Sequence, residues 1–523
     1  MRLFRAYMLT HARLLTLVAV LPALSAAGSD SANAGNGRFW GLEFSGSIGW
    51  NTSRFTRARH KPNIQIPSEY LNGVVFQTLS GGFTAVKHVS PRFSFTSGLA
   101  GNIWAPMQST KEWEWNKLTR NINGWLSVAN AHVLVGDVDR PYFDLTAGLF
   151  DYNYTGLTQD FGGYLYTAGI HPGWLASSGG TAPLAGLKIS SGYLDWLSHD
   201  LLLTLETDRP PYFDFSIGYV ASADIGSMVN IGAGVVGWRL IPGTSEDKDS
   251  TRVYDEYLSA DGERIKCYYR DVKLMGRFAL DPMSVIPEND FLGPRDLRLY
   301  AEGAVLGLQN YPESETGRGY PRIEWRIPVM AGLNLPTHPL VTYGIAPLGA
   351  SLFLIANELD TIRVDSVDIN SDGSVAEEEL DTVTVTKGFQ HKPARPYVWA
   401  AASVAAGVGS FFLDRYVGKM FRLDQLTLEV EYYQTPYDVS FHGITALPTL
   451  VDVVGTENVT YWHEDDWRWA LIAKKRLFEM LDVRFKIASD HMRVLGHGGF
   501  YYPLETLKSY KEWYWSLDLS VGF

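Results

Sequence analysis

Residues 368–379 carry the side-chain pattern that a calcium-binding loop requires. Oxygen-bearing residues stand at the liganding positions of the loop except the ninth, Ala376, where a water would have to bind, and a glycine stands at its sixth position; the ligands would be Asp368, Asn370, Asp372, Ser374 and Glu379. In such loops the glycine permits a sharp turn, and the last glutamate binds calcium through both carboxylate oxygens. A calcium ion there would fix the conformation of a loop, which is a structural role, and no other cofactor is expected.

The flanks of this loop leave a second interpretation open. Residues 361–364 and 382–386 alternate as strands do, whereas a true EF-hand has a helix on each side. Asp372-Gly373 is also a strong hairpin dipeptide. The same stretch is therefore consistent with a polar β-hairpin that binds no metal.

A second set of charged residues occupies alternate positions of segments whose intervening positions are apolar. Successive side chains of a strand point to opposite faces, so each such segment would have one ionic face and one apolar face. Opposed charges around a water-filled pore would tune its ion selectivity, whereas the same charges paired with one another would fill a closed interior. Both interpretations stay open for the set, which is Glu429, Glu431, Arg468, Asp482, Arg484, Lys486, Asp296, Arg298 and Glu302.

Alternation of period two extends over most of the chain and is clearest at its end. The last segment is apolar at every second position and finishes on an aromatic residue. This ending resembles the C-terminal strand of Gram-negative outer-membrane β-barrels, which the barrel-assembly machinery reads. The resemblance implies an assembly signal formed by Trp515, Leu517, Leu519, Val521 and Phe523.

About eighteen segments alternate in this way, and they predict an all-β fold. A tilted strand of about ten residues crosses a bilayer, and an even number of strands leaves both chain ends on the periplasmic side. We therefore expect residues 38–523 to form a transmembrane antiparallel up-and-down β-barrel of about 16–18 strands, with long extracellular loops and short periplasmic turns. Counting 340–356 and 397–409 as strands makes 358–396 an extracellular loop.

The start of the chain predicts export. Three arginines precede an apolar run, Leu14 to Leu24, and small residues follow it, so residues 1–27 read as a cleaved secretory signal peptide. Residues 28–37 read as a flexible lead-in that is too short to form a plug domain. We expect the mature chain to reside in the outer membrane, in contact with its lipids and lipopolysaccharide, and the sequence predicts no oligomeric state.

Composition agrees with a barrel and argues against a nucleic-acid partner. The chain has 16 Trp, 28 Tyr and 50 Gly, residues that gather at membrane interfaces and ease strand curvature. Its formal net charge of −12 comes without basic stripes, and nucleic-acid-binding proteins are typically basic over one face.

Several short segments suggest a more specific resemblance. Together with Trp513 to Trp515, they are similar to an uncharacterised family of large outer-membrane barrels from fibrobacterial species; they are Leu165–Gly173, Asp200–Thr207, Arg326–Pro336, Leu428–Tyr433 and Asp466–Trp469. The resemblance implies a fold and a location but no substrate.

Motifs for catalysis are scarce, and we expect no enzyme. The sequence has no Gly-x-Ser-x-Gly, no His-Glu-x-x-His and no phosphate-binding glycine loop. Asp465-Asp466 and Asp490-His491 resemble the acidic and Asp-His pairs of outer-membrane aspartyl proteases, but a solvated acidic rim explains them more simply. Aromatic residues of the predicted loops would stack on sugars, anchor in lipopolysaccharide or pack into the barrel mouth; they are Trp113, Trp115, Tyr164, Tyr166, Trp174, Tyr501 and Tyr502.

These observations predict a porin-like channel for passive diffusion of small hydrophilic solutes or ions. The alternative is a structural or adhesive surface barrel with a blocked lumen, whose loops bind polysaccharide or another envelope component. The two differ in whether a loop, above all 154–182, folds into the lumen.

Overall fold

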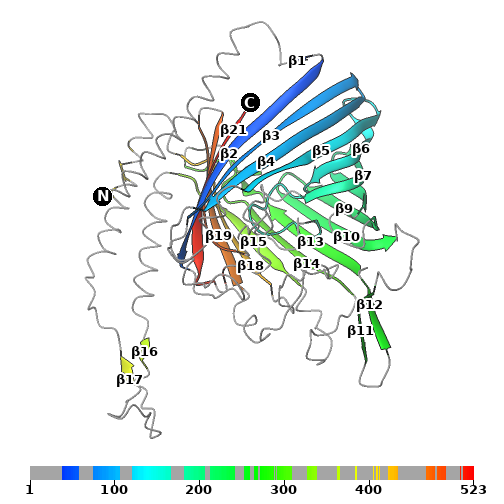
Figure 1. Ribbon diagram of the computed structural model, residues 1–523. Coiled ribbons are helices and arrows are strands. Elements are labelled where there is room, and N and C mark those ends of the chain that lie inside the picture. Colours follow the sequence, from blue (N-terminus) through cyan, green and yellow to red (C-terminus); the bar gives the residue numbers. More distant parts are fainter. Residues whose placement is uncertain are drawn as a thin grey trace.

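The protein was analysed as a computed structural model of residues 1–523 (Figure 1). The structure describes residues 38–39, 41–57, 75–106, 121–166, 182–205, 213–241, 253–258, 264–268, 271–287, 289, 291–308, 327–338, 362–364, 383–385, 405, 408–409, 412, 422–433, 467–477, 480–490, 507 and 510–523. The signal peptide and the lead-in predicted for residues 1–37 lie outside these ranges and stay predictions.

Sixteen long strands form one closed antiparallel sheet, in which each strand pairs with its neighbours in chain order and the last pairs with the first. Figure 1 shows them side by side around the barrel, coloured from blue to red along the chain. The strands are β2 (Leu42–Arg57), β3 (Val75–Ser90), β4 (Phe93–Pro106), β5 (Asn121–Gly136), β6 (Pro141–Tyr152), β7 (Ala182–Leu194), β8 (Leu197–Leu205), β9 (Phe215–Ile225), β10 (Val229–Ile241), β13 (Asp271–Leu280), β14 (Leu299–Val305), β15 (Val329–Leu335), β18 (Gln425–Tyr432), β19 (Trp467–Leu477), β20 (Leu481–Ser489) and β21 (Trp513–Gly522). The predicted fold class is therefore confirmed.

Closure of the sheet depends on the last strand. β21 pairs with β2 over most of its length, and the backbone of Phe523 exchanges two hydrogen bonds with Gly46, at 2.8 and 2.9 Å. Trp515, Leu517, Leu519 and Val521 alternate with polar residues that face the interior, so they lie on the outer face of β21. Because every strand has two partners, the barrel presents no unpaired sheet edge to its surroundings.

The alternation seen in the sequence separates the two faces of the sheet. On β18, for example, Thr427, Glu429 and Glu431 are buried in the interior, whereas Leu428 and Tyr432 are exposed on the outside. Large apolar side chains are exposed over much of the outer face, such as Phe83 at 48% and Leu99 at 49%. A soluble protein seldom exposes so extensive an apolar surface, and lipid is the environment that such a surface fits.

The strand count falls at the lower end of the predicted range. Of the eighteen candidate segments, 340–356 and 397–409 are not strands between their neighbours, because β15 pairs directly with β18 from Val329↔Tyr432 to Leu335↔Leu426. Small and apolar residues in those two segments imitate a strand pattern, and alternation alone could not separate them from true strands.

The barrel has two strands fewer than the eighteen predicted segments between its ends. This difference also changes the end of the barrel from which the connection 336–424 starts. Short turns such as 91–92, 137–140 and 195–196 lie at one end, and the strand order places Leu335 and Gln425 at that same end. The sequence predicts 358–396 at the opposite end, with the long connections, whereas the β15–β18 pairing places both ends of this connection at the end of the short turns.

Two small hairpins lie within the connections. β11 (Val253–Leu258) pairs with β12 (Arg264–Tyr268), and β16 (Ile362–Val364) pairs with β17 (Val383–Val385). The flanks of 368–379 are thus strands, as their alternation predicted. The five calcium-ligand candidates between them lie outside the described residues, so the calcium site stays a prediction.

The remaining described elements are short. β1 (Arg38–Phe39) pairs with the start of β2, and η4 (Pro282–Ser284) is a single 3-10 turn after β13. Within the described ranges, no helix is both long and apolar enough to cross a membrane.

Candidate functional site: a chain segment held across the barrel interior

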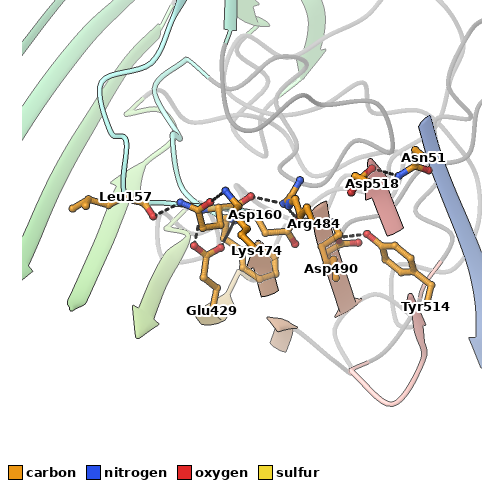
Figure 2. A network of polar contacts seen from close by, with 12 residues as sticks. Asn51, Leu157, Asp160, Glu429, Lys474, Arg484, Asp490, Tyr514 and Asp518 are labelled. Carbon is orange, nitrogen blue, oxygen red and sulfur yellow. Dashed lines mark hydrogen bonds and ion pairs between the residues drawn. The ribbon is translucent and has the colours of Figure 1, made fainter. Parts of the chain in front are cut away.

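The chain that follows β6 turns into the barrel instead of leaving it. Residues 153–166 lie across the interior and contact side chains of strands on its far side, as Figure 2 shows around Asp160 and Glu429. We call residues 153–166 the inner segment. It is the part of the predicted loop 154–182 that the structure describes.

Glycine permits the sharp bend in the inner segment. Gly162 and Gly163 both adopt left-handed backbone conformations, with φ of +87° and +71°. A Cβ on Gly162 would lie 2.7 Å from Thr158 and 3.3 Å from a carboxylate oxygen of Glu302. Residues with a Cβ rarely adopt positive φ, so this pair directs the chain back across the lumen.

Glu429 is the main anchor of the inner segment. Its carboxylate accepts hydrogen bonds from the backbone N–H groups of Gln159, Asp160 and Phe161, at 2.6, 2.8 and 2.9 Å. The hydroxyl of Tyr300 donates to the same carboxylate. Since the side chain of Glu429 is fully buried, these donors replace the water that would otherwise solvate its charge.

Two more glutamates hold the returning part of the segment. Glu302 accepts hydrogen bonds from the Tyr154 hydroxyl at 2.6 Å and from the Tyr164 backbone N–H at 3.0 Å. Glu431 accepts one from the Tyr164 hydroxyl at 2.6 Å. The guanidinium of Arg277 donates to the backbone oxygen of Tyr154. Strands β13, β14 and β18 therefore fix both arms of the bend.

Basic residues of β19 and β20 hold the tip of the segment (Figure 2). Lys474 donates to the side chain of Gln159, and the Arg484 guanidinium donates to the Gln159 backbone oxygen at 2.9 Å. Lys486 lies between two carboxylates, 2.7 Å from an oxygen of Asp160 and 2.7 Å from one of Asp490. Charge-assisted hydrogen bonds of this kind are stronger than neutral ones.

The two aspartates that share Lys486 differ in acidity. Burial raises the pKa of Asp490 to about 7, although Lys486 opposes the shift. Burial would also raise the pKa of Asp160, but the adjacent Lys486, a hydrogen bond with Asp490 and the charge of Arg484 together lower it below its usual value. Of the two, Asp160 is therefore the stronger acid.

The opposite side of the inner segment is apolar. Phe161, Leu165 and Tyr166 belong to a buried cluster with lumen-facing residues of the wall. Two glycines of that wall make room: a Cβ on Gly218 would lie 1.6 Å from the Tyr166 hydroxyl, and one on Gly234 would lie 2.5 Å from a Leu165 methyl. The segment is therefore packed against β9 and β10 as well as hydrogen-bonded to β14 and β18–β20.

The structure brings most of the predicted interior charges to the inner segment. Glu302, Glu429, Glu431, Arg484 and Lys486 contact it directly. The other four do not take part in those contacts. Asp482 pairs with Arg476 at an exposed position, Arg298 pairs with Asp281, Asp296 accepts hydrogen bonds from Gly293 and Thr337, and Arg468 donates to the backbone oxygen of Leu507.

The structure decides between the alternatives left open for two tyrosines of this site and corrects the prediction for one aspartate. Tyr164 and Tyr166 are 3% and 5% exposed inside the barrel, so they do not stack on sugars, and packing into the mouth is the correct alternative for them. Asp490 is fully buried between Lys486 and Tyr514, whose hydroxyl donates to it at 2.6 Å. It does not belong to a solvated rim, and the other members of the two pairs, Asp465, Asp466 and His491, lie outside the described residues.

The inner segment itself was also missed as the organising element. The adjacent glycines Gly162-Gly163, in a connection rich in aromatic residues, were a signal that the chain bends and packs there. Lumen-facing glycines on β9 and β10 were a second signal, since an interior glycine in a strand often marks a close approach of another chain segment. In the described parts of the chain, no three His, Cys, Asp or Glu side chains come together to hold a metal.

Comparisons with known proteins give no family assignment. No protein family and no curated protein sequence matches the chain. Among solved structures it is similar to OmpF of Salmonella typhi in complex with daunomycin, with a TM-score of 0.39 and 10% identity over 92% of this chain and 97% of that one. It is also similar to a mutant of the Rh. blastica porin, with a TM-score of 0.37 and 8% identity over 92% of this chain and 100% of the porin. The strand pairing, not these likenesses, establishes the barrel.

Proposed function

We propose that this protein is an outer-membrane channel through which small hydrophilic solutes or ions diffuse, and that the inner segment narrows its lumen. The observation that carries the proposal is a closed sheet of sixteen strands with ionic residues inside and large apolar residues outside. Barrels of about 16–18 strands generally enclose an aqueous channel. This architecture supports a role in transport rather than in catalysis.

The inner segment explains why so many charged residues lie in the interior: several of them bind this segment instead of facing an open pore. The carboxylates of Glu302, Glu429 and Glu431 accept hydrogen bonds from the inner segment and hold it in place. We propose that these residues hold the inner segment as a fixed constriction, so that the size of the remaining opening, more than a ladder of free charges, limits passage.

Orientation follows from the lengths of the connections. Bacterial barrels carry their short turns on the periplasmic side. We propose that the short turns of this barrel also lie on the periplasmic side, which places the connection 336–424 there. The outer face of β21, with Trp515 to Phe523, would then have the position of an assembly signal.

Conductance in planar bilayers tests the proposal. Protein refolded into detergent is added to a bilayer at fixed salt, and we expect discrete, reproducible current steps. Neutral polymers of increasing size, added as blockers, then give the radius of the opening. Heat-unfolded protein at the same concentration serves as the control.

The alternative, a surface barrel with a blocked lumen, makes the opposite prediction. It is favoured by the burial of the inner segment among ionic groups, which would suit a permanent closure. Refolded barrels that give no current steps, but bind envelope polysaccharide saturably, would establish this alternative in place of the channel.

A further inference from the structure

The interior wall of the barrel differs from one side to the other. Strand pairing places small uncharged side chains on the inner face of β2, β3 and β4, because their neighbours Phe44, Leu79, Phe83 and Leu99 are exposed on the outside. We call this inner face the open wall; its residues include Ser45, Ser47, Gly49, Asn51, Thr78, Ser80, Gly82, Thr84, Thr96, Gly98, Ala100 and Asn102.

The inner face of the remaining strands that surround the inner segment is different. We call the inner faces of β9, β10, β13–β15 and β18–β20 the covered wall. There Val236, Met330, Glu429 and Ala470 have no exposed surface. On the open wall, by contrast, Ser45, Ser47 and Ser80 are exposed to solvent. The inner segment therefore covers one side of the interior and leaves the other accessible.

We propose that solutes cross the barrel along the open wall and that this path suits small uncharged polyhydroxylated molecules. This inference rests on the proposed channel function and adds to it the position of the path and the class of solute. Serine, threonine and asparagine side chains both donate and accept hydrogen bonds, which is what a solute rich in hydroxyl groups requires as it exchanges water for the wall.

Charge supports the same conclusion. Between Ser45 and Asn51, between Thr78 and Thr84, and between Thr96 and Asn102, no lumen-facing residue is charged. Nearer the short turns on the same face, Glu43 and His88 lie 3.4 Å apart as a pair. At the border of the open wall, Asp518 accepts a hydrogen bond from Asn51 (Figure 2). Several charges of the covered wall, among them Glu429 and Lys486, are matched by partners on the inner segment, and others pair elsewhere, as Arg298 does with Asp281. Pores select ions through rings of fixed, unmatched charge, so this path should discriminate weakly between cations, anions and neutral molecules.

Cysteine labelling locates the path. Cys267 is the one cysteine of the sequence, so Cys267→Ser provides a thiol-free background. Into it are placed Ser80→Cys or Ala100→Cys on the open wall and Ala470→Cys on the covered wall. A cationic methanethiosulfonate reagent is then applied to single channels in planar bilayers.

We expect the reagent to lower the conductance of Ser80→Cys and Ala100→Cys in discrete steps and to leave Ala470→Cys unchanged. Mass spectrometry of the purified protein confirms which thiols have reacted. Channels that conduct but are blocked equally through Ala470→Cys, or through none of these cysteines, would overturn the path while leaving the channel function intact. The absence of any channel in the Cys267→Ser background and the wild type would instead refute the proposed function.

Liposome swelling tests the class of solute. Glucose, glucosamine and gluconate have similar sizes and differ in charge, so the swelling rates they produce report on selectivity. We expect the three rates to agree within about threefold, since unmatched charge is lacking along the path. A charged solute that enters more than about threefold faster than glucose would show that fixed charges line the path, and would overturn this part of the inference.

Discussion

The open wall and the covered wall are built from the same strand alternation but solve different physical problems. Both turn polar residues inward. On the open wall these residues are small and neutral, and Ser45, Ser47 and Ser80 are exposed. On the covered wall, Glu302, Glu429 and Lys486 are buried, and a buried ionic group is costly unless it has hydrogen-bonding partners. The comparison teaches that alternation determines whether a side chain points inward or outward. Its charge and its burial then determine whether it needs a hydrogen-bonding partner from another part of the chain.

The inner segment and the covered wall therefore depend on each other. Without the segment, Glu429 would lose the three backbone N–H groups that satisfy its carboxylate. Without Glu429, those N–H groups would be buried with no acceptor, at a cost of about 1–3 kcal/mol each. The open wall has no such dependence, so changes there should affect permeation more than stability.

The largest expected effect follows from removing the main anchor. Glu429→Ala leaves three buried donors of the inner segment without an acceptor, which should shift its equilibrium from the held to the released state by several kcal/mol, on the order of a thousandfold. We expect larger and noisier single-channel conductance in planar bilayers. This would make the covered wall resemble the open wall.

Two variants control for this change. Glu429→Gln keeps the length of the side chain and an acceptor oxygen, so it should release the segment less than Glu429→Ala does. Asp482→Asn alters a charged residue of β20 that pairs with Arg476 away from the segment, and it should leave the conductance as it is. If Glu429→Ala conducted like the wild type, the inner segment would not be held in the way that we describe.

Much of the barrel could be predicted from the sequence because alternation is a local signal. All sixteen strands coincide with predicted segments, and the interior position of residues such as Glu429 and Lys486 followed from their apolar neighbours. The sequence predicts two barrel strands too many, at 340–356 and 397–409, because β15 pairs with β18 across a long stretch of chain. The local pattern of these two segments carries no information about that pairing.

The site itself was harder to predict for a related reason. Whether a loop enters the lumen depends on contacts between residues far apart in the chain, such as Asp160 with Lys486 and Tyr164 with Glu431. A loop tyrosine has the same local sequence pattern whether it stacks on a sugar or packs inside a barrel. The difference between a surface tyrosine and a packed one lies in the glycines of the wall against which the packed ring lies, above all Gly218.

A second prediction therefore concerns the fit between the inner segment and the covered wall. Gly218→Ala places a methyl group against the Tyr166 hydroxyl, and overpacking of this kind typically costs about 1–3 kcal/mol. We expect a lower melting temperature in detergent, measured by heat-modifiable migration, and partial recovery when Tyr166→Phe is added. Gly276→Ala is the matched control, because nothing lies within 4 Å of the added methyl; equal losses in both variants would contradict the packing.

A third prediction is the pH dependence of the covered wall. Burial raises the pKa of Asp490 to about 7. A group whose pKa is raised by folding contributes stability that is present at low pH and is lost as the pH rises through its folded-state value. We expect the melting temperature to be about 2 °C lower at pH 8 than at pH 6.

The variant Asp490→Asn should reduce this difference, because its side chain does not titrate. Asp160 does not interfere, since its lowered pKa makes its contribution change only in more acidic solution. A melting temperature that rose between pH 6 and pH 8 in the wild type would contradict the assignment of Asp490.

The smallest expected change in free energy, and the sharpest test of the open wall, comes from adding one charge to it. Ser80→Lys introduces an ammonium at an exposed, neutral position, and a fixed charge in a hydrated pore attracts counter-ions by about 1 kcal/mol. We expect the ratio of anion to cation permeability, obtained from the reversal potential in a salt gradient, to rise severalfold. The melting temperature should stay unchanged. Leu79→Lys, one residue away on the outer face, cannot act on the lumen in this way and should leave the selectivity unaltered, although lipid exposure lowers its stability. A Ser80→Lys channel with the selectivity of the wild type would mean that ions pass elsewhere, and the distinction between the two walls would then have no role in transport.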